Sequence, residues 1–458
     1  MLLQLLLVWH LGPVFHSSEL PWQLLAMGAL LGQGLGYWLS GSGWSRCLLP
    51  VASLAPLLAV ALRFLCARGP LEHNFWLSLL LGLSISLLCS AGLAQLTVAY
   101  WRQRPAKVRL SRFYALELLG AIACLALALL LGPDLATLLY PWAVLLAAQG
   151  LVGWPTCAML LLVALLESLT FTRARWASGQ HAYFPFTLKA QAVSPYQYVE
   201  IAEYQGQPYL LLNGLCHYGP QSTNQLNQYL AQWPAQRLAP QARQAGCIIL
   251  GAGSFVAAAH TMKEGLKTTV IELDPEVVRV GRESFQGQWR PISDLEGLTV
   301  VVGDARQELT RQAPTGLLVI NLPTPYSLNV ASLFTREFFE SARSQLVPGG
   351  QLSLFLGGPL QKTGLDSYEG PVVQALLQVF PHLLAISSAS CDNTVILASN
   401  SSLGSPAEWR RHLLAQGQNR FGLLTEVELK VMANQFRPAS LRDFRFCAYL
   451  NRDLWFGP

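Results

Sequence analysis

Three apolar runs in the second half of the sequence are each followed within three residues by glycine, acidic or small residues that could contact a ligand. These residues are Gly251 and Gly253 after residues 247–250, Glu272 and Asp274 after residues 268–271, and Asp304 and Ala305 after residues 299–302. A glycine-rich turn lets a ligand approach the backbone and exposes a helix N-terminus. Glu272 could accept hydrogen bonds from ribose hydroxyls, and Asp304 from an adenine amino group. The ordered set predicts an adenosine nucleotide site, and the alternative is a Rossmann-like sheet without a ligand.

The form of the first turn narrows the choice of nucleotide. The stretch GAGSF at 251–255 lacks the third glycine of the GxGxxG pattern that is typical of NAD-binding turns. This favours S-adenosylmethionine, or its decarboxylated form, over NAD. The nine cysteines are scattered, without a CxxC pair or a Cys/His spacing that suits zinc. We therefore predict an S-adenosylmethionine-type cofactor and no metal.

The elements that must position these residues alternate along the chain. From Cys247 onward, short apolar strands are separated by predicted helices, which indicates a parallel, doubly wound sheet with its ligands at the carboxyl ends of the strands. The stretch Tyr196–Leu212 is β-rich, with a turn at Gln205-Gly206. We predict a linker and small β subdomain at 172–240. A Rossmann-like nucleotide-binding domain of the S-adenosylmethionine-methyltransferase type follows at 241–458.

The first 171 residues differ in composition from the rest. The whole chain is 52% hydrophobic and only 12% charged, and the excess of apolar residues lies in this region. A helix needs roughly 20 apolar residues to cross a bilayer. The candidate spans are Met1–Phe15, Trp22–Leu39, Cys47–Leu65, Phe75–Tyr100, Phe113–Leu131 and Leu135–Phe171. The last is too long for one crossing and has a break at Gly153-Trp154-Pro155, so we predict a helical membrane domain of about seven spans.

Two arguments conflict over the side of the membrane on which the C-terminal domain lies. The basic loop at 101–112 should be cytoplasmic by the positive-inside rule, and three further crossings would then place the C-terminal domain outside. Adenosine cofactors are found inside the cell. We therefore expect a cytoplasmic C-terminal domain, with a re-entrant or interfacial piece within Leu135–Phe171. The net charge of +5 comes partly from this loop and does not indicate nucleic-acid binding.

Polar and small residues within the predicted spans have two interpretations each. Glu117 and Glu167 are functional candidates, because carboxylates are costly in a membrane, or they are interfacial or hydrogen-bonded to a neighbouring helix. The glycines at 28, 32, 34 and 36 are expected to allow close helix packing and not to line a pore.

Several motifs in one order resemble the spermidine synthase (polyamine aminopropyltransferase) family, in particular its membrane-fused bacterial members. They are SPYQYVEI from Ser194, LLLNGLCHYG from Leu210, IILGAGSF from Ile248, VIELDPEVV from Val270, VVGDAR from Val301, LFTREFF from Leu333 and LVPGGQL from Leu346. The resemblance implies a transferase of the bacterial inner membrane, and a homodimer formed by the soluble domain. It also implies that Tyr196 and Gln197 lie on the acceptor side.

The sequence departs from the family where a polyamine would react. The family's DSSDP-like loop supplies an aspartate base, but here the loop is Asn321-Leu322-Pro323-Thr324-Pro325. The family's acidic residues are also replaced around Asn213–His217, Ser222-Thr223 and Gln228. An amine is mostly protonated at neutral pH and needs a base, which asparagine cannot provide. We therefore do not expect spermidine synthesis.

Three functions remain open. The first is a transferase that acts on a small-molecule or lipid acceptor other than a polyamine, with Asn321, Tyr326 and His217 at the reacting end. His217 could be the base, or a turn histidine exposed to water. The second is an inactive relative that binds a nucleotide and regulates or scaffolds a membrane complex. The third is a transporter with a cytoplasmic sensor domain.

Overall fold

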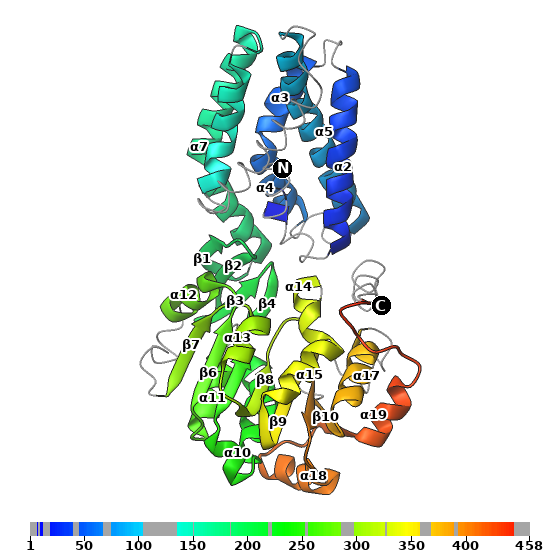
Figure 1. The fold of residues 1–458 in the computed structure, drawn as a ribbon. Helices are drawn as coiled ribbons and strands as arrows, with labels where there is room; N and C mark the ends of the chain where they lie inside the picture. Colours follow the sequence, from blue (N-terminus) through cyan, green and yellow to red (C-terminus); the bar gives the residue numbers. More distant parts are fainter. Residues whose placement is uncertain are drawn as a thin grey trace. The chain divides into compact units, whose positions relative to one another are not determined.

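The computed structural model describes most of the chain, which divides into two compact units (Figure 1). The described residues are 7, 10–11, 19–39, 45–66, 75–103, 135–149, 151–183, 185–218, 222–251, 255–284, 297–325, 328–357, 368–388 and 393–443. One unit comprises Met1–Tyr204 and Leu211–Leu215, and the other comprises Gln205–Leu210 and Cys216–Pro458. We call them the helical unit and the α/β unit.

Apolar helices of different lengths build most of the helical unit. They are α2 (Glu19–Trp38), α3 (Ser45–Ser53), α4 (Ala55–Cys66), α5 (Phe75–Arg102), the helix Leu135–Ala148 and α7 (Trp154–Tyr183). Within the described residues, two helical stretches are long and apolar enough to cross a membrane, Leu77–Tyr100 in α5 and α7 itself. The candidate Phe113–Leu131 and most of Met1–Phe15 lie outside the described residues. The count of seven spans stays a prediction.

Two breaks shape these helices. The predicted break before Pro155 is confirmed, because α7 begins at Trp154. Helix α7 then continues past Phe171 as far as Tyr183. The predicted span Cys47–Leu65 is divided into α3 and α4, at a point where Pro56 cannot donate a backbone hydrogen bond.

Glycines let α2 and α5 approach closely, as predicted. A Cβ atom added at Gly32 would lie 2.2 Å from the carbonyl oxygen of Leu87, and one at Gly36 would lie 2.4 Å from that of Ala91. Gly34 faces away and would meet nothing within 4 Å. The glycine spacing thus creates a flat packing face on α2.

A small sheet follows α7, with the strand order β1-β2-β3-β4. The strands are β1 (Thr187–Val193), β2 (Tyr198–Tyr204), β3 (Gln207–Leu212) and β4 (Leu215–Tyr218). Tight two-residue turns at Gln205-Gly206 and Asn213-Gly214 join the last three strands, and all four turn residues have positive φ angles. The predicted β-rich stretch is confirmed. Strands β1 and β2 belong to the helical unit.

The α/β unit contains an eight-stranded sheet with the order β12-β10-β11-β9-β8-β5-β6-β7. The strands are β5 (Cys247–Leu250), β6 (Thr268–Glu272), β7 (Leu298–Val302), β8 (Thr315–Ile320), β9 (Leu346–Gly357), β10 (His382–Ser388), β11 (Asn393–Ser399) and β12 (Phe421–Thr425). Strands β9, β8, β5, β6 and β7 are parallel, whereas β9, β11, β10 and β12 pair antiparallel. The prediction of an entirely parallel sheet was wrong for the last three strands. Only four residues separate β10 from β11, too few for the crossover that parallel strands need.

Helices cover both faces of this sheet. They are α8 (Ser222–Asn227), α9 (Trp233–Gln236), α10 (Pro240–Gln244), α11 (Phe255–Lys263), α12 (Pro275–Ser284), α13 (Ala305–Arg311), α14 (Leu328–Ala331), α15 (Arg336–Ser344), α17 (Glu369–Val379), α18 (Pro406–Ala415) and α19 (Glu426–Ala433). Successive residues of the central strand β5 alternate between two cores, with Ile248 and Leu250 in one and Cys247 and Ile249 in the other. The α/β unit is therefore Rossmann-like, with its polar edge at the strand ends.

Candidate functional site

Four neighbouring parallel strands end at the same level in the α/β unit. In the sheet register, Leu250 of β5 pairs with Ile271 of β6 and with Ile320 of β8, and Glu272 pairs with Val302 of β7. The residues that follow these strand ends therefore meet along one edge. This edge brings together Gly251, Glu272, Gly303-Asp304 and Asn321, in the arrangement that the sequence predicted.

The turn after β5 requires glycine at its first position. Gly251 has a φ angle of +89°, and a Cβ atom there would lie 2.5 Å from the carbonyl oxygen of Asn321. Backbone hydrogen bonds fix this approach, from Gly251 N to Ile271 O at 2.9 Å and from Asn321 N to Leu250 O at 3.0 Å. Gly253 lies outside the described residues. The backbone of Asn321 thus lies against the glycine turn.

Two acidic residues after β6 are held by local hydrogen bonds. Glu272 Oε1 accepts a hydrogen bond from Asp274 N at 2.9 Å, which orients the carboxylate. Asp274 is fully buried and accepts from Glu276 N at 3.0 Å, at the start of α12. That contact accounts for an aspartate at position 274 even without a ligand, so Glu272 is the stronger candidate of the two.

Of the two candidate residues after β7, Asp304 is exposed and Ala305 lies in the core. Asp304 is exposed and is the N-cap of α13, accepting from Arg306 N at 2.9 Å. Ala305 is buried in one of the two cores. The cap fixes the direction of the Asp304 carboxylate, which gives the edge a second acidic group.

Candidates for the acceptor side are divided between the units. Tyr196 and Gln197 belong to the helical unit and His217 to the α/β unit, whereas Tyr326 lies outside the described residues. His217 is partly buried in β4 and is not the exposed turn residue considered above. Burial lowers the pKa of His217 to about 4. The imidazole is therefore neutral at pH 7, but it is a weak base for removing a proton from an ammonium group.

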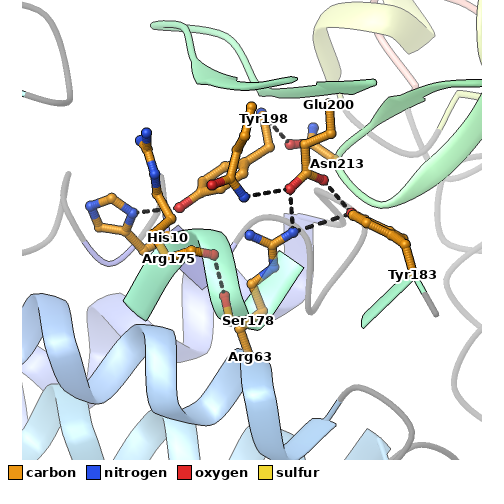
Figure 2. A network of polar contacts seen from close by, with 9 residues as sticks. His10, Arg63, Arg175, Ser178, Tyr183, Tyr198, Glu200 and Asn213 are labelled. Carbon is orange, nitrogen blue, oxygen red and sulfur yellow. Dashed lines mark hydrogen bonds and ion pairs between the residues drawn. The ribbon is translucent and has the colours of Figure 1, made fainter. Parts of the chain in front are cut away.

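Sequence reasoning missed a second polar cluster, which lies within the helical unit (Figure 2). At its centre, Arg63 of the apolar helix α4 forms an ion pair with Glu200 of β2, with Nη2 and Oε1 2.5 Å apart. A lone arginine in an apolar helix was the signal, because a buried charge requires a partner.

Known proteins resemble part of this chain. No family model matches the chain. The polyamine aminopropyltransferase of Corynebacterium efficiens is 27% identical over 164 residues, which are 35% of this chain and 31% of that protein. The resemblance to the spermidine synthase family is confirmed. The polyamine aminopropyltransferase of Mycobacterium tuberculosis is 29% identical over 118 residues, which are 24% of this chain and 23% of that protein.

The chain thus spans about a third or less of the length of these curated relatives. Among solved structures, a probable spermidine synthase from Corynebacterium glutamicum matches 55% of this chain and 95% of its own, with 19% identity and a TM-score of 0.44. A spermidine synthase in complex with the transition state analogue AdoDATO matches 54% of this chain and 84% of its own, with 15% identity and a TM-score of 0.44.

Proposed function

We propose that the α/β unit binds S-adenosylmethionine or its decarboxylated form and that the protein is a transferase. The observation that carries this proposal is the meeting of Gly251, Glu272, Asp304 and Asn321 at the ends of four adjacent parallel strands. Two curated relatives are polyamine aminopropyltransferases, which supports the transferase class.

Each residue at the edge has a distinct task in this proposal. The Glu272 carboxylate, oriented by the Asp274 amide, accepts hydrogen bonds from the ribose hydroxyls. The exposed Asp304 carboxylate accepts from the adenine amino group. Gly251 lets the Asn321 backbone pack against the turn, which brings the ends of β5 and β8 together at the edge.

The acceptor that we propose is not a polyamine. A diamine is a dication and needs carboxylates to bind it, and it needs a base to become a nucleophile. Asn321 cannot remove a proton, and the low pKa of His217, about 4, makes it a poor substitute. A small molecule or lipid with a more easily deprotonated nucleophile fits these residues better.

We also propose that the helical unit lies in a bilayer. Helix α7 exposes leucines at 161, 162, 165, 166 and 169, with Trp154 79% exposed and Trp176 41% exposed beyond them. The two tryptophans are 22 residues apart, about 33 Å along a helix, which is close to the ~30 Å of a hydrocarbon core. Tryptophan favours the two membrane interfaces.

The expected orientation has the α/β unit in the cytoplasm, where the cofactor is available. A reporter enzyme that works only in the cytoplasm should then be active when it is fused after Pro458. Activity of an export-dependent reporter at the same position would refute this orientation.

Turnover tests the transferase proposal. The purified full-length protein is incubated with decarboxylated S-adenosylmethionine, and methylthioadenosine release is measured with putrescine, with a bacterial polar lipid extract, or with neither. We expect no putrescine-dependent release, because general-base assistance typically contributes about 10² to 10⁴ in rate. Release that depends on the extract would support the transferase. Robust release with putrescine would contradict the proposed acceptor class.

A second candidate is an inactive nucleotide-binding regulator. The replacement of the family's aspartate by Asn321 is the observation that favours it. It predicts nucleotide binding without methylthioadenosine release under any of these conditions.

A further inference from the structure

Strand β2 is buried along most of its length, on both faces. Neighbouring residues such as Val199 and Glu200 are both fully buried, although they point to opposite sides of the strand. A strand of this kind cannot have its register set by apolar and polar alternation alone. The four-residue turn between β1 and β2 constrains their pairing, but another feature must fix where β2 lies against the helices.

A buried ion pair provides that feature. Glu200 Oε1 accepts from Arg63 Nη2 at 2.5 Å and from Gln191 Nε2 at 2.7 Å, and Glu200 Oε2 accepts from the hydroxyl of Tyr183 (Figure 2). The exposed fractions of the Arg63 and Glu200 side chains are 3% and 0%. The guanidinium carbon of Arg63 also lies 4.9 Å from the ring centroid of Tyr198. The carboxylate thus contacts groups from α4, α7 and β1.

Tyr198, two residues earlier in β2, forms a second anchor. Its hydroxyl is hydrogen-bonded to His10 Nδ1 at 2.7 Å, and His10 Nε2 is 2.8 Å from Thr137 Oγ1. Its backbone N donates to Asn213 Oδ1 at 2.9 Å in the turn between β3 and β4. Tyr198 therefore connects the helices, through its side chain, with the small sheet, through its backbone.

The turn just before β2 carries the two residues that the sequence placed on the acceptor side. Ser194 Oγ accepts from Tyr196 N at 3.1 Å and from Gln197 N at 3.0 Å, and Ser194 N donates to Gln197 O at 2.9 Å. The flanking residues Val193 and Tyr198 both lie in the core of the helical unit. Tyr196 is 51% exposed at the tip of the turn.

We propose that Arg63 and Glu200 are positioning residues that fix the register of β2 and thereby hold Tyr196 and Gln197 in place. A buried ion pair adds little stability compared with apolar residues of the same volume, whereas it strongly disfavours any arrangement that separates the charges. A slip of two residues, which keeps every side chain on its own face of the strand, would place Ala202 against Arg63 and leave both charges unpaired. The role of the turn on the acceptor side rests on the function proposed above.

The test compares register in the full-length protein and in the double variant Arg63→Met/Glu200→Leu. Ala192 pairs with Val199 in the native register, so the cysteine pair Ala192→Cys/Val199→Cys reports that register by its disulfide yield. The pair Ala192→Cys/Ile201→Cys reports a slip of two residues. Hydrogen exchange of the peptide covering Ser194–Tyr204 gives an independent measure of order.

We expect Glu200→Leu alone to lower the midpoint temperature of unfolding. The double variant should unfold at about the same temperature as the parent. The double variant should nevertheless lose most of the native disulfide, gain the slipped one, and exchange its β2 amides about tenfold faster. The matched control is Lys189→Met/Glu203→Leu, which removes the exposed ion pair of the same two strands and should change neither reading.

The proposal would be overturned if the double variant formed the native disulfide in the same yield as the parent and exchanged its β2 amides at the same rate. Failure of the double variant to fold would also overturn it, because the pair would then be a source of stability and not of register. Methylthioadenosine binding by the parent protein is measured in parallel. Its absence would refute the proposed function and leave the register result interpretable.

Discussion

The strand-end edge of the α/β unit and the buried cluster of the helical unit hold polar groups in opposite ways. At the edge, backbone geometry sets the positions: Gly251 lies against Asn321, and Asp304 caps its own helix. In the cluster, side chains from distant segments hold one another, as Arg63 and Glu200 do. At the edge the Asp304 carboxylate is exposed, whereas the buried cluster uses its charges to fix structure.

The largest expected loss of nucleotide affinity comes from adding a side chain where the edge has room only for backbone. Gly251→Ala adds a methyl group 2.5 Å from the Asn321 carbonyl oxygen, at a φ angle of +89°. We expect at least about a hundredfold loss of methylthioadenosine affinity, or ~2.7 kcal/mol, measured by calorimetric titration.

Gly265→Ala is the matched control, because Gly265 has a similar φ angle of +82° but meets nothing within 4 Å. Both variants pay the conformational cost of about 1 to 2 kcal/mol for a left-handed alanine. Only Gly251→Ala should lose affinity. An equal loss in both variants would show that the glycine turn acts through stability alone.

The sequence predicted the edge well because its signals are local. Glycine after one strand and carboxylates after the next two are typical of a Rossmann-like sheet, and parallel pairing brings them together. The glycines at 28, 32, 34 and 36 likewise predicted a packing face, although Gly34 would meet nothing within 4 Å. The antiparallel strands β10 and β11 were missed, although their short connection excluded a parallel crossover.

The buried cluster could not be predicted in the same way. Arg63 and Glu200 are 137 positions apart, and no local pattern relates them. A lone arginine in an apolar helix requires only that some partner lies nearby. Which carboxylate provides it depends on how α4, α7 and β2 pack together. Asp274, by contrast, caps the start of α12 through a local contact, which accounts for an aspartate there with or without a ligand.

In the proposed function, Glu272 and Asp304 hold an adenosine nucleotide, and amide variants of the two residues should therefore bind it more weakly. Asp304→Asn can still cap α13, and Glu272→Gln can still accept from the Asp274 amide, so both variants should fold. Glu428→Gln, at an exposed cap of α19, is the control.

Calorimetric titration with methylthioadenosine should show a loss of about 1.5 to 3 kcal/mol, or roughly ten- to hundredfold in Kd, for each edge variant and none for the control. If both edge variants bind methylthioadenosine as the parent does, or if the parent does not bind it, the strand-end edge is not the nucleotide site.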